Sequence, residues 1–152
     1  MDPVQDDDEA GRRIVAVVHV AMLAAVPLYG AVLWLLRGDR GLSAGAALSP
    51  RLPWILLAVG AAEFAAATVI GRNLLRSAGP GAGAPDRVRR FFLIRFAAAE
   101  AIAVFGLFAG FRGAPPMQAG VLFAASAAAM LLAAPTRAAW ARAYEETRSP
   151  RG

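Results

Sequence analysis

Four long apolar stretches, separated by arginine-rich segments, constrain this chain more than any other feature of its sequence. They cover about residues 14–36, 52–71, 91–111 and 117–134. A helix needs roughly 20 apolar residues to cross the hydrocarbon core of a bilayer, and each stretch is close to that length or longer. A crossing helix also satisfies its own backbone hydrogen bonds, which lipid cannot do. The sequence therefore predicts an all-α protein, a bundle of four transmembrane helices.

Composition agrees with a membrane protein. Hydrophobic residues make up 58% of the 152 residues, above the ~45–50% usual for soluble domains. The chain has no cysteine, which excludes disulfides and thiolate metal sites. Its net charge of +5 comes from arginine without lysine, and the arginines border apolar stretches. We therefore predict the lipid bilayer, and no nucleic acid, as the partner of these arginines. Arginine without lysine, with abundant Ala and Gly, is typical of a GC-rich bacterial genome, so we predict a multi-pass protein of the bacterial inner membrane.

The polar ends of the chain differ from its apolar centre. Residues 1–13 are acidic and are expected to form a disordered tail. The apolar stretch 14–36 is longer than the ~7–15 apolar residues of a signal peptide, which favours a retained first helix over a cleaved one. Residues 14–134 are predicted to be the transmembrane domain. Residues 135–152 follow that domain and are expected to form an amphipathic surface extension and a tail.

The arginines also predict the orientation. Eleven of them lie in the N-terminal tail, the connector around residues 72–90 and the C-terminal tail, whereas four lie in the other two connections. Segments rich in arginine stay in the cytoplasm. Both termini are therefore predicted to be cytoplasmic, in agreement with an even number of spans.

Two carboxylates interrupt the apolar stretches near their centres. Glu63 lies nine residues from Arg72, and Glu100 lies ten residues from Arg90. These separations correspond to depths of about 14 and about 15 Å at the helical rise. If the two helices present these faces to each other, the carboxylates approach, and one of them keeps its proton. Both residues are candidates for binding a proton or a cation, and the alternative is a structural role between helices.

Arg95 and His19 lie shallower on the same side and are candidate partners of these carboxylates. Arg95 either extends to the cytoplasmic headgroups or forms a pair within the bundle. His19 either joins such a cluster or hydrogen-bonds to water or a backbone carbonyl. One histidine and two glutamates on three helices lack a diagnostic metal spacing. We therefore assign no metal, no cofactor and no catalytic residue.

Small residues recur at helical spacing in the last two stretches. Such rows allow helix backbones to approach closely in a membrane. The candidate packing residues are Gly106 and Gly110 in the third stretch and Gly120, Ala124 and Ala128 in the fourth.

The run Ala-Glu-Ala-Ile-Ala-Val-Phe-Gly-Leu at residues 99–107 resembles the carboxylate helix of the rotor-ring c subunits of rotary ATP synthases. In that family a buried carboxylate is followed by a small apolar stretch and an aromatic-Gly-Leu step. The resemblance implies that Glu100 carries a proton or a sodium ion. It covers about ten residues, and the preceding apolar stretch lacks the glycine repeat of that family.

No nucleophile–base pair, phosphate loop or metal motif is evident in the sequence. The first functional hypothesis is therefore a non-enzymatic accessory or interaction component of a membrane complex, with another membrane protein or a second copy as partner. The alternative is a protein that binds a proton or a cation through Glu63 and Glu100, similar to a rotor-ring subunit.

Overall fold

The computed structural model describes residues 3–40, 49, 51–77 and 83–148. The helices of these residues are α1 (Pro3–Arg40), α2 (Leu52–Arg76), α3 (Ala84–Phe111), α4 (Pro116–Leu132) and α5 (Arg137–Arg148). No strand occurs in this part of the chain, so the all-α prediction is confirmed there. Helices α1, α2 and α3 are each long and apolar enough to cross a membrane. Helices α4 and α5 meet that condition only as a pair, and a bend of 64° separates them.

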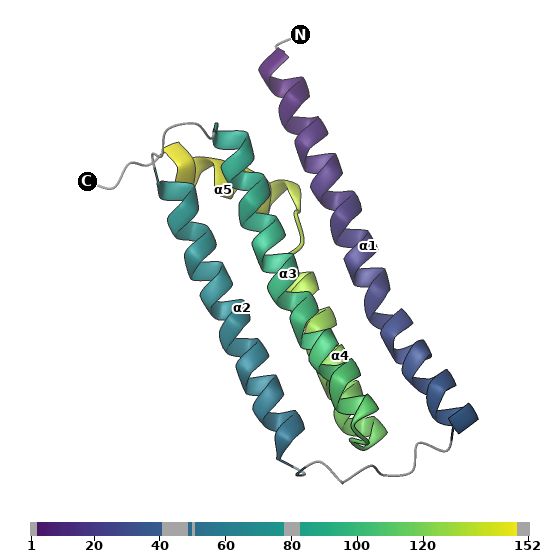
Figure 1. Cartoon of the computed structure of the whole chain (residues 1–152). Coiled ribbons are helices and arrows are strands. Elements are labelled where there is room, and N and C mark those ends of the chain that lie inside the picture. The colour runs from purple at the N-terminus through teal and green to yellow at the C-terminus, as the bar shows by residue number, and fades with distance from the viewer. Residues whose placement is uncertain (1–2, 41–48, 50, 78–82, 149–152) are drawn as a thin grey trace.

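Helix α3 is the centre of the bundle. It contacts each of the other four helices, with α1 and α2 on either side of it in Figure 1. One stripe of α3 is fully buried, formed by Phe92, Phe96, Ala99 and Ala103. These positions are three or four residues apart and so lie on one face of the helix. By contrast, α1 and α2 bury a small part of their apolar surface, which leaves broad apolar faces exposed.

Two of the predicted packing glycines lie where helices touch. A Cβ atom at Gly106 would meet Leu122 of α4 at 3.0 Å, and one at Gly110 would collide with Leu33 of α1. The absence of a side chain at these positions therefore lets α3 approach both neighbours. The small residues of α4 lie instead on its exposed face: Gly120, Ala124 and Ala128.

Helix α2 approaches α3 through two glycines that the sequence analysis did not single out. A Cβ atom at Gly60 would lie 2.7 Å from Ile102, and one at Gly71 would lie 2.6 Å from Phe91. Both distances are far shorter than a normal carbon–carbon contact of about 3.5–4.0 Å. These glycines fix which face of α2 points toward α3, and thus which face points away.

A tight turn joins α3 to α4 and makes them antiparallel. Gly113 adopts a positive φ of 86°, a conformation that suits glycine. The amide of Ala114 donates to the carbonyl of Ala109 at 2.9 Å, as in a Schellman end of a helix. Farther along the pair, the buried Ser126 hydroxyl donates to the carbonyl of Ala99 at 2.7 Å. This hydrogen bond stabilises the α3–α4 contact at the depth of Glu100.

The chain turns a corner between α4 and α5. Helix α4 ends at Leu132, slightly before the predicted end at residue 134, because the residue before Pro135 disfavours the helical conformation. The hydroxyl of Thr136 accepts a hydrogen bond from the amide of Ala139 at 3.1 Å and caps the start of α5. Trp140 then stacks on Phe92 of α3, with ring centroids 5.4 Å apart. Helix α5 is therefore packed across the end of the bundle, as Figure 1 shows.

The start of α1 differs from the sequence-based expectation. Residues 1–13 are expected to be a disordered tail, whereas α1 begins at Pro3. Proline suits the first turn of a helix, because its fixed φ angle is already helical. Glu9 also forms an ion pair with Arg13 one turn later, at 2.9 Å. These local effects extend the helix beyond its apolar part.

Candidate functional site

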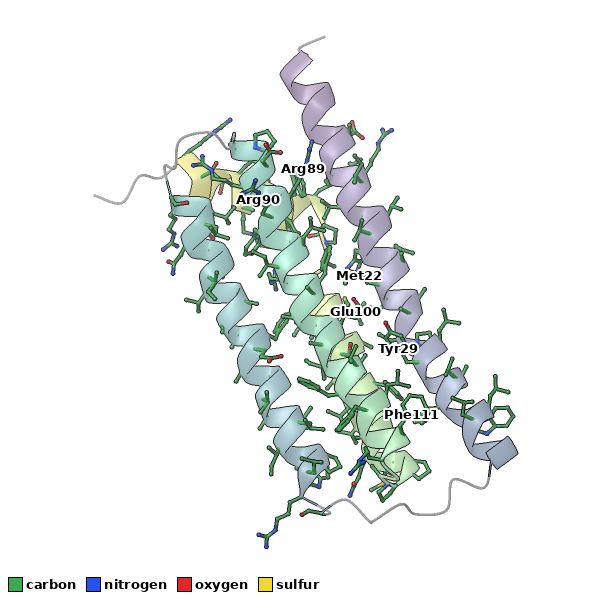
Figure 2. All side chains as sticks on the ribbon, viewed as in Figure 1. Met22, Tyr29, Arg89, Arg90, Glu100 and Phe111 are labelled. Carbon is green, nitrogen blue, oxygen red and sulfur yellow. The ribbon has the colours of Figure 1, made fainter. Side chains whose placement is uncertain are left out.

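The carboxylate of Glu100 is held by a hydrogen bond between helices. The hydroxyl of Tyr29 on α1 donates to Oε1 of Glu100 on α3 at 2.7 Å. Both side chains are partly buried, and Figure 2 shows them facing each other between the two helices. A short O–H···O bond of this kind stabilises a carboxylate that lies among apolar residues. The contact also links α1 to the central helix.

Glu63 lies in the opposite environment. Its side chain is exposed on α2, beside the face that meets α3, and it forms no hydrogen bond or ion pair with any described residue. Its neighbours on the exposed surface of the helix are apolar: Val59 one turn before, Ala66 one turn after and Ile70 two turns after. The nearest arginine on the helix, Arg72, is nine residues away, which is about 14 Å along the axis. Nothing described in the chain therefore compensates this carboxylate.

The two carboxylates do not form one site within a single copy of the chain. Glu100 faces α1, whereas the face of α2 that meets α3 is formed around Gly60 and Gly71 rather than Glu63. No hydrogen bond joins the two glutamates, although both are among the described residues. The two glutamates lie at a similar level along the bundle, but Glu100 lies at the interface of α3 with α1, whereas Glu63 lies on the exposed surface of α2.

His19 is buried between α1 and α3. Its ring lies 4.9 Å from the ring of Phe96, measured between centroids, and its Nδ1 atom has no hydrogen-bond partner among the described residues. Phe96 and Glu100 are four residues apart and lie on the same side of α3. His19 and Glu100 thus share the α1–α3 interface, yet no hydrogen bond or ion pair connects them.

Arg95 lies on another side of α3 and forms no pair with either carboxylate. Its Nη2 donates to the carbonyl of Leu132 at the end of α4, at 3.0 Å. Its guanidinium also lies over two aromatic rings, 5.6 Å from the centroid of Phe64 and 5.3 Å from that of Phe91. Arg95 therefore connects α2, α3 and α4 at the arginine-rich end of the bundle.

Tyr29 is the functional residue that the sequence analysis missed. Its position in the first apolar stretch is not distinctive, and counting from Arg13 places it about 24 Å along the helix, compared with about 15 Å for Glu100. The structure keeps this register, because His19 lies beside Phe96 and Leu33 lies beside Gly110. The long tyrosine and glutamate side chains bridge the remaining distance along the helix axes. A tyrosine hydroxyl within a long apolar stretch was the available signal.

No known protein family, no curated protein and no solved structure matches this chain. The resemblance of residues 99–107 to rotor-ring c subunits therefore stays a prediction. Any function must be argued from the arrangement of the side chains themselves.

Proposed function

We propose that the chain is an integral protein of the bacterial inner membrane with four crossing segments, the fourth formed by α4. The support is the exposed apolar surface of α1 and α2, together with the separation of the arginines toward the ends of the helices. The arginine-rich end holds the starts of α1 and α3 and the whole of α5, and Figure 2 labels Arg89 and Arg90 there. By the arginine rule this end, with both termini, is cytoplasmic.

Within that membrane we propose a non-enzymatic role, as an interaction component of a larger membrane complex. One observation carries this proposal: Glu63 is exposed on α2, amid apolar residues, at a depth near the centre of the span. A charged residue facing lipid at that depth is disfavoured by about 2.5–3.5 kcal/mol on insertion scales. Such residues almost always face protein or water. A helix of a second protein, packed on this face, would supply that environment.

The chemistry of this face defines the partner. Alanines such as Ala62 and Ala66 are exposed beside Glu63 and allow close approach of another helix. A carboxylate is matched by a hydrogen-bond donor or a cation, so the partner helix carries a Ser, Asn, Gln, His, Lys or Arg side chain at mid-depth. A second copy packed through the same face would instead bring two Glu63 carboxylates together, which is unfavourable unless they share a proton.

Site-specific photocrosslinking tests the proposal. A photoreactive amino acid at Ala66, on the Glu63 face, is expected to crosslink to one discrete membrane protein in cells. The same probe at Ala24, an exposed position of α1, serves as the matched control. The crosslink from position 66 should be lost in Glu63→Ala and retained in Glu63→Gln, because glutamine keeps a hydrogen-bonding side chain.

Three results would contradict this role. Crosslinks to lipid alone would show that the face has no protein partner. A crosslink to a second copy of the chain would overturn the choice of a different protein. A crosslink that persists unchanged in Glu63→Ala would show that the carboxylate does not recognise the partner.

Glu100 supports a second candidate function, the binding of a proton or a cation. The observation that favours it is the single neutral donor on this carboxylate: the Tyr29 hydroxyl is a partner for either the ionised or the protonated group. A carboxyl-reactive carbodiimide, followed by mass spectrometry, would test it. Labelling is expected at Glu100 and should fall when the pH or the sodium concentration rises; labelling insensitive to both would contradict the candidate.

A further inference from the structure

A cavity of about 390 Å³ lies at the corner between α4 and α5, at the arginine-rich end of the bundle. Its walls come from four helices, α2, α3, α4 and α5. The bend after Leu132 opens this space, because α5 turns across the ends of α2 and α3 instead of continuing the line of α4. The cavity is separate from both carboxylates discussed above, since neither of them lines it.

Three arginines from three helices line this cavity: Arg72 of α2, Arg95 of α3 and Arg142 of α5. One acidic residue, Glu146, also lines it, but its carboxylate is already in an ion pair with Arg76 at 3.4 Å. Arg72 forms no ion pair with any described residue. Like charges gathered around one space repel one another unless an anion lies between them. The cavity is thus electrostatically suited to an anion.

Arg95 is the least exposed of the three arginines that line the cavity. The rings of Phe64 and Phe91 and the carbonyl of Leu132 hold its guanidinium in place. Its Nε atom is buried and has no hydrogen-bond partner among the described residues. An arginine fixed in this way keeps free donors in a planar arrangement that suits phosphate oxygens. The other two arginines are exposed, and Arg142 donates its Nε to the carbonyl of Ala138 at 3.3 Å, which leaves its terminal nitrogens for a ligand.

The remaining wall of the cavity is apolar. It is lined by Leu75, Phe91 and Ala139 and by two leucines at the end of α4, Leu131 and Leu132. These two leucines are 63% and 75% exposed. A small soluble anion gains nothing from contact with an apolar wall. A phospholipid, in contrast, presents a phosphate and an acyl chain together, and both can be accommodated here. Basic pockets between transmembrane helices at the cytoplasmic side are a known setting for anionic headgroups.

We propose that this cavity binds the phosphate of an anionic phospholipid, with Arg95, Arg72 and Arg142 as its ligands. The acyl chains run outward along Leu131 and Leu132. The site rests on the chain crossing a bilayer but is independent of any partner at Glu63, and the two proposals fail separately because one concerns lipid and the other a protein.

Native mass spectrometry of the full chain in a neutral detergent tests the site. The probes are dioleoyl phosphatidylglycerol and, for comparison, dioleoyl phosphatidylcholine, each added at a few molecules per protein. One phosphatidylglycerol molecule is expected to bind selectively. The double variant Arg72→Gln/Arg142→Gln should weaken it by roughly thirtyfold, taking about one kcal/mol for each arginine.

A matched variant controls for net charge. Arg90 and Arg137 are exposed at the same end of the bundle, and neither lines the cavity. The double variant Arg90→Gln/Arg137→Gln should therefore leave the affinity for phosphatidylglycerol within about twofold. Arg95→Gln should abolish selective binding, but it also removes the contact with Leu132, so the outer pair of arginines is the decisive test.

Three outcomes would overturn the proposal. Equal loss of binding in the two double variants would mean general attraction between the lipid and basic residues. Equal binding of phosphatidylcholine would mean that the phosphate site does not select an anionic lipid. Inorganic phosphate that displaces the lipid completely at millimolar concentration, and raises the melting temperature as much as the lipid does, would assign the site to a soluble anion instead.

Discussion

The two carboxylates in the middle of this bundle have similar depth and opposite surroundings. Glu100 lies between α1 and α3, with the Tyr29 hydroxyl 2.7 Å away. Glu63 is exposed on α2 and has no described partner. The difference arises from neighbouring residues: Gly60 and Gly71 turn one face of α2 toward α3, and Glu63 is left beside that face rather than on it. A carboxylate in an apolar helix is therefore informative only together with the face on which it lies.

Removing each carboxylate in turn should give the largest contrast. We expect Glu63→Leu to stabilise the purified protein in bicelles by up to about 3 kcal/mol, because it removes an uncompensated charge from an apolar face. Glu100→Leu should instead destabilise it by about 2 kcal/mol, since the partly buried Tyr29 hydroxyl loses its acceptor. Reversible unfolding in bicelles measures both. A destabilising effect of Glu63→Leu, equal to that of Glu100→Leu, would mean that Glu63 has a partner within the chain.

Added bulk should separate inward from outward small residues. Gly106→Leu is expected to destabilise the bundle by about 2 kcal/mol, because the new side chain collides with Leu122 and Phe123 of α4. Gly120→Leu should change stability little, since a Cβ atom there meets nothing within 4 Å. The same unfolding assay compares them, and equal effects would contradict the placement of the two faces. A loss of partner crosslinking in Gly120→Leu would place the partner on α4 instead of α2.

The rows of small residues also show what spacing can predict. The spacing of Gly106 and Gly110 is the same as that of Gly120, Ala124 and Ala128, yet the first pair meets other helices and the second row is exposed. Hydropathy predicted that the chain is all-helical, because long apolar stretches with internally satisfied backbones leave few alternatives. It could not predict which side of each helix is buried, since inward and outward positions are both apolar in a protein of this kind.

The positions of the polar residues illustrate the same limit. The sequence identified Glu63 and Glu100 because charge is rare in an apolar stretch. It did not identify Tyr29 as the partner of Glu100, because counting residues compares backbone levels and not how far two long side chains extend toward each other. Nor did it predict the cavity around Arg95, which exists only because Pro135 ends α4 and Trp140 holds α5 against Phe92.

The hydrogen bond to Glu100 should have a smaller effect than the carboxylate itself. Tyr29→Phe removes one donor and leaves the ring, so we expect a loss of about 1 kcal/mol, within the range measured for hydrogen bonds between membrane helices. Glu63→Gln is the matched control: it removes the charge without removing any described contact and should not destabilise the protein. A change below the error of the unfolding assay in Tyr29→Phe would indicate that water satisfies Glu100 equally well.

The smallest effect is expected where a carboxylate is exposed outside the apolar region. Glu9 is exposed near the start of α1 and forms its ion pair with Arg13, one turn away. Exposed pairs of this kind contribute little in water, so Arg13→Gln should lower stability less than Tyr29→Phe does. The same assay in high salt should erase the difference, because salt screens exposed charges. An effect of Arg13→Gln as large as that of Glu63→Leu would show that exposure alone, rather than exposure to lipid at mid-depth, makes a charge energetically important in this protein, and the argument for a partner at Glu63 would lose its basis.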